Sequence, residues 1–113
     1  MSAITTHVLD TSRGRPASGI PVVLEIEEHG NWRQLADGAT DADGRVRTLL
    51  PDGTPLVAAT YRLLFSVDGY FENQRVPFFF KRIVVEFVVG TATDRYHVPL
   101  LLSPFGYTTY RGT

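Results

Sequence analysis

Short apolar stretches recur about every 8 to 15 residues along the chain, and Gly, Pro or Asp residues separate them. The stretch at residues 21–29 shows the pattern best, because Val22, Leu24 and Ile26 alternate there with polar residues. Such alternation places apolar side chains on one face of a strand and polar side chains on the other. Many short strands separated by turn residues predict an all-β sandwich or barrel.

We expect strands at residues 6–10, 21–29, 32–40, 45–50, 61–67 and 83–89, and a strand-like run at 96–107. Tight turns are expected at Gly30–Asn31 and at residues 41–44. Only residues 68–75 have helical character, and Asp68 is placed to cap one or two helical turns.

Several apolar side chains fall on the predicted outer faces of these strands, opposite the core sets. They are Leu64, Val84, Val88 and Leu101. An outer face this apolar usually has something packed on it. We therefore expect a subunit interface.

The 113 residues predict a single domain spanning 1–113. The formal net charge of -1 argues against a nucleic-acid partner, and the absence of cysteine excludes disulfides, thiolate nucleophiles and cysteine-based zinc sites. No apolar run is long enough to span a membrane. With no basic leader at the N-terminus and no peroxisomal signal at the C-terminus, a cytoplasmic protein is expected.

Two of the three histidines leave the predicted core. His7 and His97 each lie in a strand, on the face opposite its apolar set, whereas His29 adjoins a turn and is expected in solvent. Together with Arg45 and Arg111 they form a candidate site, because histidine moves protons near neutral pH and arginine binds planar oxyanions.

No standard nucleophile, phosphate-loop or zinc-protease motif is present. Residues 41–44 resemble the start of a calcium loop, but the remaining ligands are missing, so no metal is expected. Any hydrolysis would therefore use water activated by histidine.

The last four residues, Tyr110 to Thr113, combine a phenol, a guanidinium, a glycine, a hydroxyl and an α-carboxylate. One interpretation is an edge strand with a solvated Arg111. The other is a terminus folded back into an anion-binding site, and the resemblance described next favours this second interpretation.

The chain resembles the 5-hydroxyisourate hydrolases, the transthyretin-related enzymes of purine breakdown. The matching segments are HVLDT at residues 7–11, GRPA at 14–17, TDADGR at 40–45, YHVPLLLSP at 96–104 and YRGT at 110–113. The resemblance covers the chain from its first strand to its last residue. Thr113 departs from the family's usual terminal serine but keeps a hydroxyl, and its added methyl stiffens the side chain.

The resemblance implies a transthyretin-like sandwich of two sheets, with about eight strands and one short helix. It also implies a homotetramer, a dimer of dimers, with sites in the channel between dimers. The implied reaction is cofactor-free ring opening of 5-hydroxyisourate to 2-oxo-4-hydroxy-4-carboxy-5-ureidoimidazoline. His7, Arg45 and His97 would be catalytic, and the substrate would contact His7, Arg45, Tyr110, Arg111 and Thr113.

Two other functions remain open at this point. A transthyretin-type carrier would bind a small molecule in the same channel without chemistry, and it would have no need of the histidine–arginine set. A generic β-sandwich interaction module that acts as a monomer would have no need of the apolar residues on the outer faces. The sequence leaves open which histidine is the base.

Overall fold

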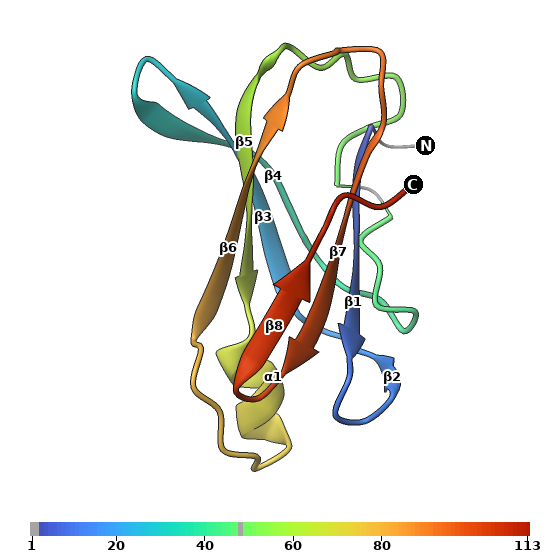
Figure 1. Ribbon diagram of the computed structural model, residues 1–113, viewed down its shortest axis with the longest axis vertical. Helices are drawn as coiled ribbons and strands as arrows, with labels where there is room; N and C mark the ends of the chain where they lie inside the picture. The colour runs from blue at the N-terminus through green and yellow to red at the C-terminus, as the bar shows by residue number, and fades with distance from the viewer. Residues whose placement is uncertain (1–2, 48) are drawn as a thin grey trace.

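Two four-stranded sheets lie face to face in the computed structural model, which describes residues 3–47 and 49–113 (Figure 1). The elements are β1 (Ile4–Asp10), β2 (Arg15–Pro16), β3 (Pro21–Glu28), β4 (Asn31–Ala39), β5 (Ala59–Ser66), α1 (Asp68–Asn73), β6 (Arg82–Val89), β7 (Tyr96–Ser103) and β8 (Gly106–Thr109). One sheet has the order β2-β1-β7-β8 and the other β4-β3-β5-β6. The eight strands and one short helix confirm the expected fold class.

The core lies between the sheets, where the alternating apolar residues of both meet in one hydrophobic cluster. In β5, Tyr61, Leu63 and Phe65 are almost fully buried, as their period of two predicts. In β6, Ile83, Val85 and Val89 are buried on the inner face, and Phe87 on the same face is partly buried. These two strands pair directly as neighbours.

The strand expected at residues 45–50 does not form, so that prediction is wrong for the described part of the segment; Thr48 lies outside the described residues. Arg45 makes only an isolated bridge to His7. Val46, Leu49 and Leu50 are all buried, but their spacing is not that of a strand. The segment packs onto the core as a loop, through apolar contacts rather than a ladder of hydrogen bonds.

Smaller differences concern ends and turns. The run at 96–107 is a hairpin of β7 and β8 rather than one strand. The tight turn centres on His29 and Gly30, whose φ values are 53° and 79°, one residue before the expected place. Val67, not Asp68, is the N-cap of α1, and no side chain caps the helix.

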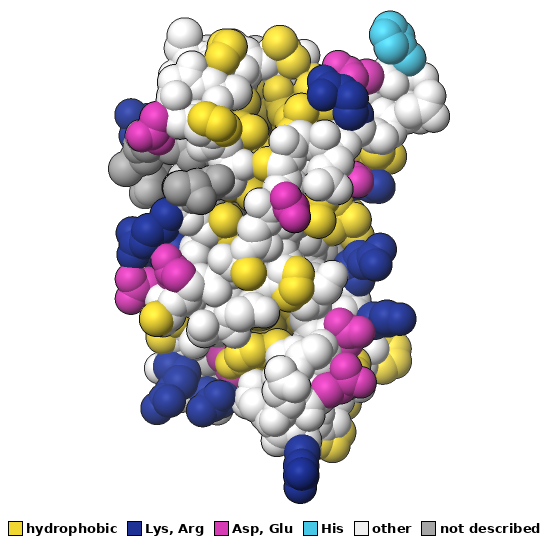
Figure 2. Space-filling view, turned by 180° about the vertical axis from the view of Figure 1, so that it is seen from behind, with side chains coloured by type: hydrophobic (Ala, Val, Ile, Leu, Met, Phe, Trp, Pro, Cys, Tyr) yellow, Lys and Arg dark blue, Asp and Glu magenta, His cyan; other side chains and the backbone are white. Residues whose placement is uncertain are grey.

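The outer faces carry the apolar side chains that the sequence predicts there. Val84 and Val88 are 44% and 71% exposed, and Phe79 and Tyr107 near the β8 edge are also exposed. Seen from behind, Lys and Arg side chains are interspersed with Asp and Glu (Figure 2). Among the described residues, no helix has the length and apolar character to cross a lipid bilayer.

Asp10 ties the loop between β1 and β2 to α1. The residue is 1% exposed, and its carboxylate accepts hydrogen bonds from Ser12 N (3.0 Å), Ser12 Oγ (2.6 Å), Arg13 N (3.1 Å) and Tyr70 Oη (2.7 Å). Burial alone would raise the pKa of Asp10, but these four donors together hold it below its usual value. The ionised form is therefore the one that stabilises the fold.

We expect Asp10→Asn to lower the free energy of unfolding by about 1.5–3 kcal/mol near pH 7, because hydrogen bonds to a charged group are lost. Since the pKa of Asp10 is lowered on folding, its contribution is complete above the ordinary value near 4 and disappears as the pH falls below it. Urea titrations at several pH values measure this. The exposed Asp37→Asn is the control, and an equal loss at pH 3 and pH 7 would contradict the assignment.

Candidate active site

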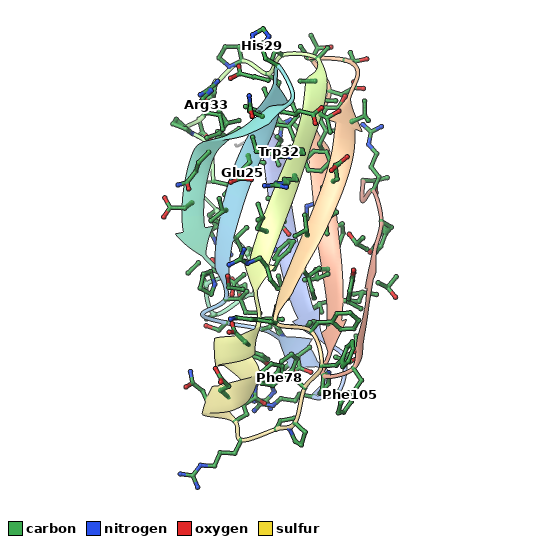
Figure 3. The ribbon with its side chains drawn as sticks, turned by 90° about the vertical axis from the view of Figure 1, so that its left-hand side faces the viewer. Glu25, His29, Trp32, Arg33, Phe78 and Phe105 are labelled. Carbon is green, nitrogen blue, oxygen red and sulfur yellow. The ribbon has the colours of Figure 1, made fainter. Side chains whose placement is uncertain are left out.

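The two outward histidines lie on the outer face of the sheet that contains β1 and β7. These strands pair in parallel, with Thr5 opposite His97 and His7 opposite Pro99. Thr5, His7 and His97 therefore share the face turned away from the core, where all three are half-buried. The prediction that both histidines leave the core is confirmed. His29 is exposed at the tip of the β3–β4 hairpin, at the opposite end of the molecule from α1 (Figure 3).

The loop after β4 brings Arg45 to β1. Val8 N donates to Gly44 O at 2.8 Å, and the main chains of His7 and Arg45 form an isolated antiparallel β-bridge. Gly44 has a φ of 77°, and a Cβ on it would collide with the carbonyl oxygen of Val8, so glycine is required for this approach. Asp41 fixes the turn, because its Oδ1 accepts from Arg45 N at 3.0 Å.

The C-terminal segment returns to the same face and lies beside β7. Gly112 N donates to His97 O at 2.7 Å, and the two residues form an isolated bridge. The Arg111 guanidinium lies 4.6 Å from the centre of the Tyr96 ring, and its Nη2 is 3.8 Å from Asp94 Oδ2. The terminus is therefore docked on the sheet by main-chain and side-chain contacts, unlike a frayed end.

These segments enclose a hollow of about 740 Å³ on the outer face. Its lining residues are Thr5, Thr6, Arg45, Val46, Arg47, Arg95, His97, Arg111, Gly112 and Thr113. Four of the sequence-predicted site residues thus line one hollow: Arg45, His97, Arg111 and Thr113. His7 adjoins it through its bridge to Arg45, and Tyr110, which is 54% exposed, does not line it.

The hollow is rich in arginine, with four of these residues in its lining. Arg47 is held by Asp41 at 2.9 Å and Asp43 at 2.6 Å. The Arg45 guanidinium has no hydrogen-bond or ion-pair partner among the described residues. A side chain of this kind is available to an anionic or oxygen-rich ligand.

The surroundings of His97 favour its neutral form. Burial lowers the pKa of His97, and the electrostatic effects of Arg45 and then of His7 lower it further. A backbone hydrogen bond with Thr5 acts in the opposite direction but is outweighed. His97 is therefore able to accept a proton near neutral pH.

Sequence reasoning missed three lining residues that bear on the chemistry: Thr5, Arg47 and Arg95. Thr5 Oγ1 lies 2.8 Å from His97 Nδ1, in a hydrogen bond whose donor depends on the ring tautomer. The only signal for Thr5 was its place two residues before His7 on the same face. Arg47 lies two residues after Arg45 in the segment expected to be a strand, and Arg95 lies just before the family-like segment at residues 96–104.

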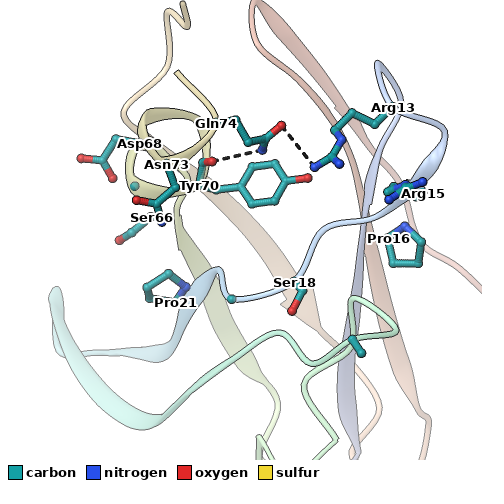
Figure 4. Close-up of a pocket in the computed structure, with 13 residues that line it drawn as sticks. Arg13, Arg15, Pro16, Ser18, Pro21, Ser66, Asp68, Tyr70, Asn73 and Gln74 are labelled. Carbon is teal, nitrogen blue, oxygen red and sulfur yellow. Dashed lines mark hydrogen bonds between the residues drawn. The ribbon is translucent and has the colours of Figure 1, made fainter. Parts of the chain in front are cut away.

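A second and larger hollow of about 910 Å³ lies between α1 and the β1–β2 loop (Figure 4). Arg13 donates there to Gln74 Oε1 at 3.3 Å, and Tyr70 lies between the two walls. No histidine is among its lining residues. Within the described ranges, no three His, Cys, Asp or Glu side chains are grouped so as to hold a metal ion. The histidine–arginine hollow is therefore the candidate for acid–base chemistry.

The family model described as the HIUase/Transthyretin family matches residues 4–112. The chain belongs to this family. The 5-hydroxyisourate hydrolase of Salmonella typhimurium is 44% identical over 110 residues, which cover 97% of this chain and 80% of the relative. These findings confirm the resemblance seen in the sequence.

Two solved structures are similar to this chain, one named as a hydrolase and the other as a transthyretin. Klebsiella pneumoniae 5-hydroxyisourate hydrolase has a TM-score of 0.84 and 35% identity, with 97% of this chain and 98% of that one covered. Sea bream transthyretin, solved in complex with thyroxine, has a TM-score of 0.91 and 31% identity, with 99% and 96% covered. Because both share the fold, the fold alone does not separate enzyme from carrier, and the site has to.

Proposed function

We propose that this protein hydrolyses 5-hydroxyisourate in the degradation of urate, and that the histidine–arginine hollow is its active site. One observation carries the proposal: His97, Arg45, Arg111 and Thr113, which come from three distant segments, line the same hollow. A carrier needs a shaped cavity but no proton acceptor held neutral beside arginines. The 44% identity to a protein named as this hydrolase supports the same conclusion.

The proposed reaction is addition of water to a ring carbonyl. One histidine takes a proton from water, the water oxygen bonds to the carbonyl carbon, and the oxygen of that carbonyl becomes negatively charged. The C–N bond of the ring amide then breaks, and the departing nitrogen takes up a proton. His7 and His97 are the two groups proposed for these transfers, and each lies on the outer face of the sheet.

Arginines would hold the oxygen-rich ring and stabilise the developing oxyanion. Arg45 is the first candidate because its guanidinium has no side-chain partner in the described part of the chain, and Arg111 is the second. Removing one donor of this kind from a known oxyanion site costs about 3–4 kcal/mol, or about 10²–10³ in kcat. Tyr110 does not line the hollow. We propose for it a contact with bound substrate and no part in the proton transfers.

The deciding experiment generates 5-hydroxyisourate from urate and follows its ultraviolet decay with and without the protein. We expect a decay well above the spontaneous rate and proportional to protein concentration. Binding of the compound with no acceleration would favour the carrier, and neither binding nor acceleration would favour an interaction module. Arg45→Gln is the matched variant, because Arg45 lies outside the named strands and lines the hollow.

The proposed assembly is a homotetramer, a dimer of dimers, with the hollow in the channel between dimers. The exposed apolar side chains Val84, Val88 and Tyr107 support an assembly, because they leave water only if another surface covers them. A fully active monomer, identified by its mass in solution, would contradict it. We also propose that residues 1–113 act as one domain in the cytoplasm, which cell fractionation with an activity readout tests.

A further inference from the structure

Among the described residues, Thr5 is the one whose side chain forms a hydrogen bond with a ring nitrogen of His97. Its Oγ1 lies 2.8 Å from Nδ1, across the parallel pairing of β1 and β7 that places the two residues directly opposite each other. The Thr5 hydroxyl has no other hydrogen-bond partner in residues 3–47 and 49–113. The contact is thus made between two strands held in register, and not by a mobile loop.

The hydrogen bond at Nδ1 determines what the other ring nitrogen can do. A neutral imidazole carries one proton, so a proton on Nδ1 leaves Nε2 as an acceptor, and a proton on Nε2 makes it a donor. Only Nε2 remains available to a ligand, because Nδ1 is engaged by Thr5. Which tautomer is present therefore decides whether His97 takes a proton from water or gives one.

The surroundings of the ring favour the proton on Nδ1. His97 lines the hollow together with four arginines, and guanidinium groups only donate hydrogen bonds. An unprotonated Nε2 suits such neighbours, whereas an Nδ1–H group has the hydroxyl oxygen of Thr5 to donate to at 2.8 Å.

We infer that Thr5 is a positioning residue that receives the Nδ1 proton of His97, so that Nε2 is the base that activates water. This inference rests on the proposed hydrolase function and selects one of its two histidines. Nε2 takes one proton from water while the water oxygen bonds to the substrate carbonyl carbon. His7 is then left to position that water or to return a proton to the departing nitrogen.

The first test measures the tautomer directly by ¹⁵N NMR of histidine-labelled protein, with His97 assigned by its loss in His97→Asn. In the wild type near pH 8 we expect a protonated Nδ1 and an unprotonated Nε2. Thr5→Val, which removes the hydroxyl at nearly constant size, should give a mixture of tautomers, and Thr5→Ser should restore the wild-type spectrum. A wild-type ring protonated on Nε2 would overturn the inference.

The second test is kinetic. Thr5→Val should lower kcat about tenfold with little change in KM, since a lost orienting hydrogen bond is worth about that factor. The acid limb of the pH–rate profile should move to lower pH in Thr5→Val. An oxygen that accepts from Nδ1–H also stabilises the imidazolium, so its loss lowers the pKa of His97. The charged groups facing His97 are unchanged in this variant: His7, Arg45, Arg47, Arg95, Arg111 and the α-carboxylate of Thr113.

The control is Thr109→Val. The Thr109 hydroxyl donates to Pro99 O at 2.8 Å, on the strand that carries His97 but away from the hollow. It should leave kcat and the acid limb unchanged. An acid limb that moves to higher pH in Thr5→Val would mean that Thr5 donates to Nδ1, and would overturn the inference. If the wild type fails to hydrolyse the substrate while the Nδ1–H tautomer is observed, the proposed function is wrong and the role of Thr5 in orienting the ring still holds.

Discussion

Replacing His97 by asparagine is expected to lower kcat by about 10²–10⁴-fold, the usual contribution of a general base. Asparagine keeps a polar side chain of similar size on the outer face of β7 but accepts no proton. The sheet should be unaffected, because His97 is half-buried and lies outside the core. Decay of 5-hydroxyisourate at saturating concentration measures the loss.

The pH profile of the same variant identifies the group. Burial, then the electrostatic effects of Arg45 and His7, lower the pKa of His97 below its ordinary value near 6.5. The neutral and active form therefore persists into mildly acidic solution, and wild-type activity should fall only as the pH drops through this lowered value. His97→Asn should lack that limb.

His29→Asn is the matched control, since His29 is exposed at the far hairpin tip (Figure 3). It should keep the wild-type rate and profile. A His97→Asn variant with more than half of the wild-type kcat would remove His97 from the mechanism.

The elements that could be predicted from sequence are those in which one face of a strand is buried. In β3 and β5 the period of two is set by which side chains leave water, so Leu24 and Leu63 mark the core without any tertiary information. The strand prediction for residues 45–50 failed because burial there does not follow a period of two. Val46, Leu49 and Leu50 reach the core from a loop, and apolar composition alone cannot distinguish that from a strand.

The site was predictable in its chemistry and only partly in its members. His7 and His97 fall off the core faces by local alternation, and this holds in the structure. Local alternation places Thr5 on the outer face with His7, but only the pairing of β1 with β7 sets Thr5 opposite His97. That pairing joins residues 92 positions apart, and no local pattern encodes it.

The last prediction concerns Gly112, the point at which the C-terminal segment touches β7. A Cβ at this position would lie 2.6 Å from His97 Cδ2 and 3.2 Å from Pro99 Cγ, so Gly112→Ala cannot be accommodated without movement. Either the imidazole turns, or the terminus lifts and loses the bond from Gly112 N to His97 O. Both responses displace the base relative to Arg111 and Thr113. A misplacement of about 1 Å lowers turnover about 10²-fold.

Gly106→Ala separates this effect from a general weakening of β8, because a Cβ at Gly106 would meet only Ser103 Oγ, at an ordinary 3.7 Å. We expect the control to keep its activity, and both variants to melt near the wild-type temperature, since neither position belongs to the core cluster. The large loss should thus appear in kcat and not in stability. A Gly112→Ala variant with wild-type turnover would mean that the terminus can move away from β7 without disturbing His97, and that its docking on the sheet serves something other than catalysis.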